Sequence, residues 1–302
     1  MITARNYAAQ AEKFMREIAA RNANKFEVSS RNAMAIAETI KKAQHFAIPD
    51  GGALFDDKLK GLDLSNIRLP YPDITVEWFI DKPKNDGKYP CPKRIIVASE
   101  VEDFIVCVGV WYSHEIPKGC WGFNPFKIFI KMDNSVPFPS SGFGDIVPFR
   151  FEDGREIQIA PAFTQDQFAE NLRSGEISSK EALEVLQDST QEMMGLFEFL
   201  EALSCKNVIA EPLEKIDHAK NIRRIRDGKL PIYETRILTI DTGRNSGEKH
   251  DSWVGAGDRA SVRQHLRRGH IRRHPTAGNI WVNSCVVGYS ELGVINKSYE
   301  VH

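Results

Sequence analysis

The chain has 302 residues, of which 42% are hydrophobic and 10% aromatic, so one large domain or two ordinary domains can form a core. Its apolar runs, such as residues 104–108, are far shorter than the roughly 18 residues that a membrane span needs. The formal net charge is −1, but residues 206–302 hold 17 Lys and Arg against 11 Asp and Glu, which indicates a region that faces a polyanion.

The N-terminal residues and the cysteines indicate the compartment. Residues 1–14 lack the apolar run of a signal peptide. The five cysteines are scattered, odd in number and without a CxxC pair, so neither a disulfide framework nor a zinc site is favoured. We therefore expect a protein of the cytoplasm with reduced thiols, without membrane contact and without a metal ion or cofactor.

Two helices are predicted in the N-terminal part. Residues 4–23 carry apolar side chains at spacings of three and four, the pattern of an amphipathic helix. A second helix begins near Ser29 and Ser30, which are suitable caps, and ends near His45, before the breakers of residues 49–52.

The central part predicts a mainly antiparallel sheet of about five to seven strands. Its strand-like runs are residues 74–80, 94–99, 104–112, 126–132, 147–151 and 156–159. Between them, residues 121–126 predict a loop that presents aromatic side chains to a partner.

Helical patterns return after the sheet and then give way to a basic segment. Residues 164–172 predict a short helix, and a long helix runs from Ser179 to about Ser204, where Ser178 and Glu181 have the spacing of a capping box. Residues 206–230 predict a boundary, and strands follow at 231–240, 280–282, 285–287 and 294–301. The fold class is therefore α+β, with N-terminal helices, a central sheet and a long helix in residues 1–205 and a basic, β-rich module in residues 206–302.

Three stretches of the C-terminal third carry a resemblance to known sequences. They are residues 203–208, residues 223–231 with Tyr233, and residues 263–273 followed by 280–282, Gly288 and 297–299. In these stretches the chain resembles an uncharacterised family of tailed-phage, prophage and plasmid proteins with a C-terminal RxHxxRGHxRR...WV motif. The family commonly has an aromatic residue after the Gly-His pair, where this chain has Ile271. The resemblance implies a mobile genetic element and expression inside a bacterial host.

The densest group of reactive side chains lies in residues 263–274. His265 and His270 are the candidate catalytic residues, because one imidazole can act as a base and the other as an acid while arginines stabilise the charge on a phosphate. The candidate nucleic-acid-binding residues are Arg223, Arg224, Arg226, Lys229, Arg263, Arg267, Arg268, Arg272 and Arg273. If residues 262–274 are extended, alternation places His265 and His270 on opposite faces of the strand.

Three interpretations of this cluster remain open. It is the catalytic centre of a metal-independent ribonuclease, a surface that contacts phosphates without catalysis, or a basic segment that pairs with the acidic N-terminal part. A metal site built from His265 and His270 with Asp251, Asp258 or His250 has no motif that fixes its geometry.

Two functions of different class follow. The resemblance, together with the lack of a complete catalytic signature, favours a binding protein that acts on a host macromolecule and counters a host defence system. The alternative is a nucleic-acid-binding protein or metal-independent ribonuclease that uses residues 263–274. The partner is then a host protein or a nucleic acid, and the sequence specifies neither which of the two nor the oligomeric state.

Overall fold

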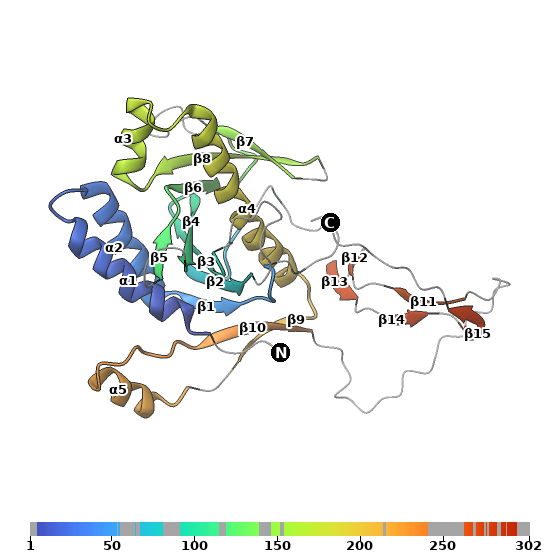
Figure 1. Ribbon diagram of the computed structural model, residues 1–302. Coiled ribbons are helices and arrows are strands. Elements are labelled where there is room, and N and C mark those ends of the chain that lie inside the picture. Colours follow the sequence, from blue (N-terminus) through green and yellow to red (C-terminus); the bar gives the residue numbers. More distant parts are fainter. Residues whose placement is uncertain are drawn as a thin grey trace.

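Figure 1 shows the protein as a computed structural model. It describes residues 5–52, 54, 64, 67–80, 91–114, 119–138, 146–151, 154–213, 216–240, 263–267, 270–274, 276, 278–282, 285–287 and 289–294.

The two N-terminal helices form a hairpin. They are α1 (Tyr7–Asn22) and α2 (Glu27–Lys42), and both predicted helices are confirmed. The predicted caps of the second helix are wrong, because α2 begins at Glu27 and Ser29 and Ser30 lie inside it, where the Ser30 hydroxyl donates to the Ala19 carbonyl of α1. Small side chains such as Ala11 and Ala37 are fully buried, which lets the helices pack closely on each other and on the sheet. The second helix ends before His45, which belongs instead to the short strand β1 (Gln44–Ala47). The Nδ1 atom of His45 lies 2.7 Å from Thr75 Oγ1. Pairing with the neighbouring strand therefore determines the extended conformation at His45.

Within the described residues the sheet has ten strands. Besides β1 they are β2 (Asp73–Phe79), β3 (Lys93–Val101), β4 (Phe104–Ser113), β5 (Cys120–Phe123), β6 (Phe126–Lys131), β7 (Val147–Arg150), β8 (Glu156–Phe163), β9 (Val208–Pro212) and β10 (Thr235–Ile240). Their order is β7-β8-β6-β4-β3-β2-β1-β10-β9, with β5 paired to β4. Only β1 runs parallel to its neighbours, β2 and β10. The predicted α+β class with a mainly antiparallel sheet is confirmed.

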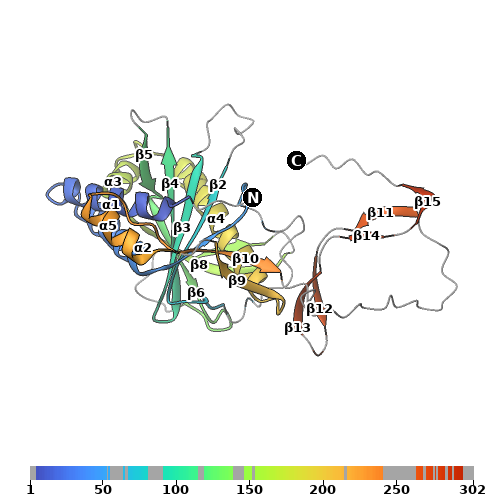
Figure 2. The ribbon, with the colours of Figure 1, turned by 90° about the horizontal axis from the view of Figure 1, so that it is seen from below.

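Helices cover both faces of the sheet, so its central strands alternate between two cores. On β3, Ile95 and Val97 pack with α1 and α2, whereas Ile96 and Ala98 face the core that includes α4 (Ser179–Leu203). Figure 2 shows α1 and α2 on one side of the strands and α4 on the other. The sheet thus holds α4 at a fixed place, where it contacts β3, β4, β6 and β9.

The start of α4 is determined locally. The Ser178 hydroxyl accepts a hydrogen bond from the Glu181 N–H at 3.2 Å, and the Glu181 carboxylate accepts one from the Ser178 N–H at 2.8 Å. The predicted capping box is therefore confirmed. The preceding helix α3 (Asp166–Ser174) begins two residues later than the sequence pattern predicts.

One sequence prediction in this region is wrong. Residues 121–126 do not form an aromatic loop, because Trp121 and Phe123 lie on β5 and are 4% and 3% exposed in the core beneath α1. Residues 206–230, where a boundary is predicted, contain β9 and the helix α5 (His218–Arg226). The strand predicted at 231–240 begins only at Thr235.

The last strands form two small sheets. They are β11 (Arg263–Arg267), β12 (His270–His274), β13 (Gly278–Val282), β14 (Cys285–Val287) and β15 (Tyr289–Val294). One sheet has the order β14-β11-β15, and the other consists of β12 and β13. The division into 1–205 and 206–302 stays a prediction about independent folding, although β9 and β10 are hydrogen-bonded into the ten-stranded sheet. Among the described helices, none is both long and apolar enough to span a bilayer.

Candidate functional site

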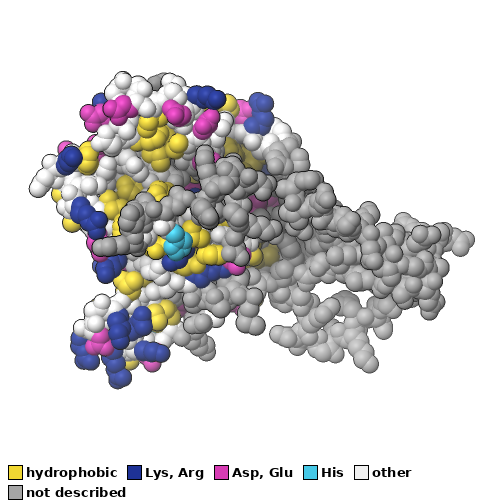
Figure 3. All heavy atoms as spheres, in the orientation of Figure 1, with side chains coloured by type: hydrophobic (Ala, Val, Ile, Leu, Met, Phe, Trp, Pro, Cys, Tyr) yellow, Lys and Arg dark blue, Asp and Glu magenta, His cyan; other side chains and the backbone are white. Residues whose placement is uncertain are grey.

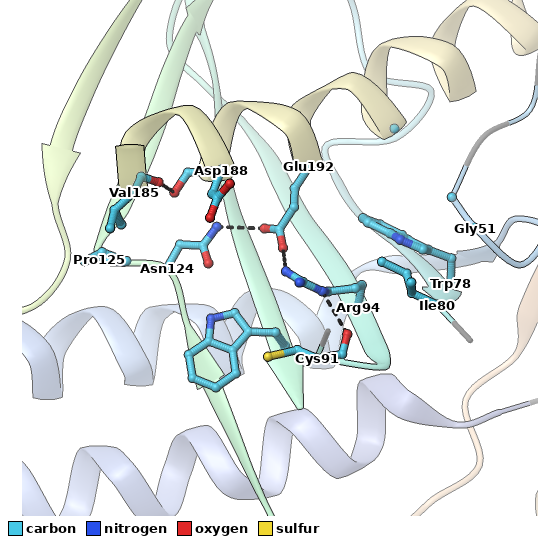
Figure 4. A pocket seen from close by; sticks show the side chains of 14 residues that line it. Gly51, Trp78, Ile80, Cys91, Arg94, Asn124, Pro125, Val185, Asp188 and Glu192 are labelled. Carbon is cyan, nitrogen blue, oxygen red and sulfur yellow. Dashed lines mark hydrogen bonds and ion pairs between the residues drawn. The ribbon is translucent and has the colours of Figure 1, made fainter. Parts of the chain in front are cut away.

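A pocket of about 410 Å³ lies between α4 and the sheet. Its floor is a row of three side chains from neighbouring strands, because Arg94 on β3 is paired with Trp78 on β2 and with Trp111 on β4. Gly51 and Gly52, which follow β1, form one wall, and Figure 4 shows the labelled residues around the opening. The pocket therefore lies at the carboxyl ends of the parallel pair β1 and β2, where open sheets commonly bind ligands.

The roof of the pocket is one stripe of α4. Val185, Asp188, Ser189, Glu192 and Gly195 line it, at spacings of three and four residues that place them on one face of the helix. Because the capping box fixes where α4 begins, it also fixes which of its residues face the sheet.

A buried carboxylate occupies the centre of this stripe. Glu192 is 8% exposed and accepts hydrogen bonds from Arg94 Nη1 at Oε1 and from Asn124 Nδ2 at Oε2, the latter at 2.7 Å. Arg94 Nε also donates to the Cys91 carbonyl at 3.0 Å. Burial raises the pKa of the Glu192 carboxyl above its ordinary value, although Arg94 and Asn124 act in the opposite direction.

Glycines make room for this ion pair. A Cβ atom at Gly109 of β4 would collide with Glu192 Oε2 and Asn124 Nδ2, so only glycine allows both groups to lie against the strand. A Cβ atom at Gly52 would lie 2.6 Å from Trp78 Nε1, and Gly52 has a φ of +78°. These glycines are requirements of the pocket.

No local sequence pattern predicts this site. Arg94 and Glu192 are 98 residues apart, and Asn124 and Glu192 are 68 apart, so no local motif unites them. Two signals were present. Glu192 interrupts the apolar face of a long helix, and Gly109 interrupts the most apolar strand.

The predicted basic residues of the 223–229 stretch are brought together by α5. Asp217 caps this helix by accepting from the Lys220 N–H at 3.1 Å, and Gly228 ends it with a φ of +71°. Asn221 holds the helix to the returning chain, because its amide bonds both the N–H and the carbonyl of Ile232, at 2.8 and 3.0 Å. The helix is therefore anchored in a defined orientation.

The side chains of α5 lie mostly in solvent. Arg223, Arg226 and Lys229 are exposed, while Arg224 is half-buried and donates from Nε to the Leu230 carbonyl at 3.2 Å. Figure 3 shows Lys and Arg side chains gathered where Figure 1 places α5. The one ion pair given for α5 within the described residues is the 4.0 Å contact of Arg226 with the adjacent Asp227.

The apolar residues of α5 are exposed as well. The exposed fractions of Ile222 and Ile225 are 68% and 56%, and the two are three residues apart on the helix. The surface of α5 thus combines positive charge with two apolar side chains.

The histidine cluster is divided between two sheets. His265, Arg263 and Arg267 lie on β11, which pairs with β14 and β15, whereas His270, Arg272 and Arg273 lie on β12, which pairs with β13. Arg272 is exposed, and Arg268 lies outside the described residues. His265 and His270 are therefore not on one continuous strand. Their predicted catalytic role stays a prediction.

Two further buried titratable groups lie on the opposite face of the sheet. Glu77 on β2 is 1% exposed and accepts from the Ala8 N–H at 3.3 Å, and burial raises the pKa of its carboxyl to about 7. Burial lowers the pKa of His45 to about 4, and its ring stacks on Tyr233 with the centroids 4.5 Å apart. In the part of the chain that the structure describes, no three His, Cys, Asp or Glu side chains are grouped so that they would hold a metal ion.

Comparisons with known proteins leave the function to be argued from this geometry. No protein-family model matches the chain, and no curated protein or solved structure matches it either.

Proposed function

We propose that the protein is a nucleic-acid-binding protein that contacts phosphates through α5 and the turn that follows it. The observation that carries this proposal is the concentration of charge in residues 220–229, which hold five Lys and Arg and a single acidic residue, Asp227. An anchored helix that presents several cations to solvent suits the phosphate backbone of RNA or DNA, because each contact releases condensed counterions.

The remaining observations are compatible with this surface. Arg272 of β12, which also belongs to the predicted nucleic-acid-binding set, is a further exposed cation outside α5. Ile222 and Ile225 offer apolar contact to sugars or bases between the charged groups. The resemblance of the C-terminal third to phage and plasmid proteins supports a host macromolecule as the target and interference with a host defence system as the role.

Binding without catalysis is favoured over a ribonuclease. General acid–base catalysis needs both imidazoles within hydrogen-bond reach of one phosphodiester. The strands that carry His265 and His270 are members of different sheets within the part of the chain that the structure describes.

The experiment measures the affinity of the full chain for labelled RNA, single-stranded DNA and duplex DNA at several salt concentrations. The double variant Arg223→Ala/Arg226→Ala removes two exposed cations from α5. We expect the slope of log K against log salt to become shallower by about 1.4 for single strands and about 1.8 for duplexes, with weaker binding to every sequence.

The matched control is the double variant Arg21→Ala/Arg31→Ala, which removes two cations of similar exposure, 67% and 69%, from α1 and α2. It should leave both affinity and slope unchanged. Equal losses in both double variants, or no binding to any nucleic acid, would contradict the proposal. A stoichiometric complex with a host protein in place of nucleic acid would do the same. The labelled nucleic acids are also run on gels that detect cleavage. RNA cleavage that is lost in His270→Ala would establish the ribonuclease instead.

A further inference from the structure

We infer that the pocket beneath α4 binds an uncharged, planar heteroaromatic ring that carries hydrogen-bond donors and acceptors, the class to which nucleobases belong. This site is separate from α5 and does not depend on the function proposed for it. Three features of the pocket lead to this ligand: its charge, its polar groups and its walls.

The charge of the pocket disfavours anionic ligands. Arg94 and Glu192 form an ion pair, so their charges balance, and Asp188 one turn earlier on α4 adds a negative charge. A phosphate or carboxylate would meet this net negative charge, and Arg94, the one cation among the described lining residues, is already paired with Glu192. An uncharged ligand avoids this repulsion. An organic cation, which Asp188 would attract, is the competing ligand that agmatine represents in the test.

The polar groups offer both kinds of hydrogen bond. Arg94 uses Nη1 for Glu192 and Nε for the Cys91 carbonyl, and its Nη2 has no hydrogen-bond partner among the described residues. The Asn124 amide donates to Glu192 through Nδ2, and Figure 4 shows its oxygen turned away from that carboxylate. Asp188 is exposed at the opening and supplies a charged acceptor. A ring with an acceptor beside an amino or imino N–H is complementary to this set.

The pocket also has flat apolar surfaces beside its polar groups. Trp78 and Trp111 flank Arg94 in the floor, and Ile80, Pro125 and Val185 complete the surroundings. A Cβ atom at Gly122, opposite Trp111, would lie 2.5 Å from the indole, so the glycine lets this ring lie close against β5. Indole surfaces stack favourably on planar heterocycles.

The volume is adequate for such a ligand. At about 410 Å³, the pocket falls within the range of roughly 300–1,000 Å³ typical of small-molecule sites. The ion pair beneath it is held by Asn124 and Gly109, so the polar groups are already oriented before a ligand binds.

The test is titration of the full-length protein with adenosine, guanosine, cytidine and uridine, followed by calorimetry and by tryptophan fluorescence. We expect one or more of these uncharged nucleosides to bind with saturation and to quench fluorescence. The corresponding monophosphate should bind less tightly, and the organic cation agmatine should not compete. Asp188→Asn should weaken binding about ten-fold, because the acceptor loses its charge.

The matched control is Glu184→Gln on the same helix, since Glu184 is 62% exposed and does not line the pocket. It should bind nucleosides as the wild type does. Absence of binding by all four nucleosides, tighter binding of agmatine, or equal effects of the two substitutions would overturn the inference. The α5 variant Arg223→Ala/Arg226→Ala should keep nucleoside binding, so a failure of one proposal is distinguishable from a failure of the other.

Discussion

Replacing Glu77 with glutamine tests whether the buried carboxyl beneath the first helix has a raised pKa. The N-cap residue of α1, Asn6, makes no capping hydrogen bond with its side chain. Glu77 replaces this cap from β2, because its carboxylate accepts from the Ala8 N–H and is 1% exposed. A buried carboxyl in this position must titrate differently in the folded and unfolded chains.

The size of the effect follows from the pKa of Glu77. Burial raises this pKa from 4.5 to about 7, so the folded protein binds the proton more tightly than the unfolded chain does. The contribution to stability is therefore fully present below pH 4.5 and is lost as the pH rises through 7. At about 1.4 kcal/mol per pKa unit, the linkage amounts to about 3 kcal/mol in total and to about 2 kcal/mol between pH 5 and 7.

A second buried group hides this dependence in the wild type. Burial lowers the pKa of His45 from 6.5 to about 4, so its contribution is present above pH 6.5 and is lost as the pH falls through 4. Between pH 4.5 and 6.5 the two groups therefore change stability in opposite directions and by similar amounts. Removing the titration of Glu77 leaves that of His45 uncompensated.

The assay is urea unfolding of the wild type and Glu77→Gln at pH values from 5 to 8. The difference between their free energies of unfolding should change by about 2 kcal/mol between pH 5 and 7, with the wild type losing stability relative to the variant. Glu211→Gln on β9, where the carboxyl is exposed, is the control and should run parallel to the wild type. Parallel curves for Glu77→Gln as well would refute the raised pKa of the buried Glu77 carboxyl.

Two further predictions concern the pocket and the chain division. Gly109→Ala should lower the free energy of unfolding by about 1–3 kcal/mol and abolish nucleoside binding, because the added methyl group displaces Glu192 and Asn124. Urea unfolding measures the loss of stability, and calorimetry measures the loss of nucleoside binding. A fragment of residues 206–302 should show neither cooperative unfolding nor dispersed amide resonances, since β10 loses its parallel partner β1, and a folded, soluble fragment would contradict this.

Local patterns identified the elements that carry their own signals. The long helix α4 has a capping box at Ser178 and an apolar stripe, and β3 and β4 are long apolar runs joined by a short turn. The strands that the sequence did not reveal, β1, β5 and β9, have four or five residues each. In so short a strand the conformation is determined by hydrogen bonds to neighbours, which local propensity does not contain.

The helix α5 was missed for a different reason. Helix prediction relied on a buried apolar face, and none of the residues of α5 is buried. The signals that it does carry are Asp217 before its first turn and Gly228 after its last. Its basic residues were recognised as candidates for nucleic-acid binding, but the helix that groups them was not.

The two proposed sites share one structural support, which determines how their variants should be interpreted. Strand β1 lies between β2, which carries Trp78, and β10, which follows α5, and the chain leaving β1 forms the Gly51–Gly52 wall of the pocket. A substitution that disturbs β1 would therefore weaken both binding activities without touching either ligand. The variants themselves lie outside β1: Arg223→Ala/Arg226→Ala is in α5, and Asp188→Asn is in α4. Loss of only the nucleic-acid contact in the first and of only the nucleoside in the second is the result that direct contact requires.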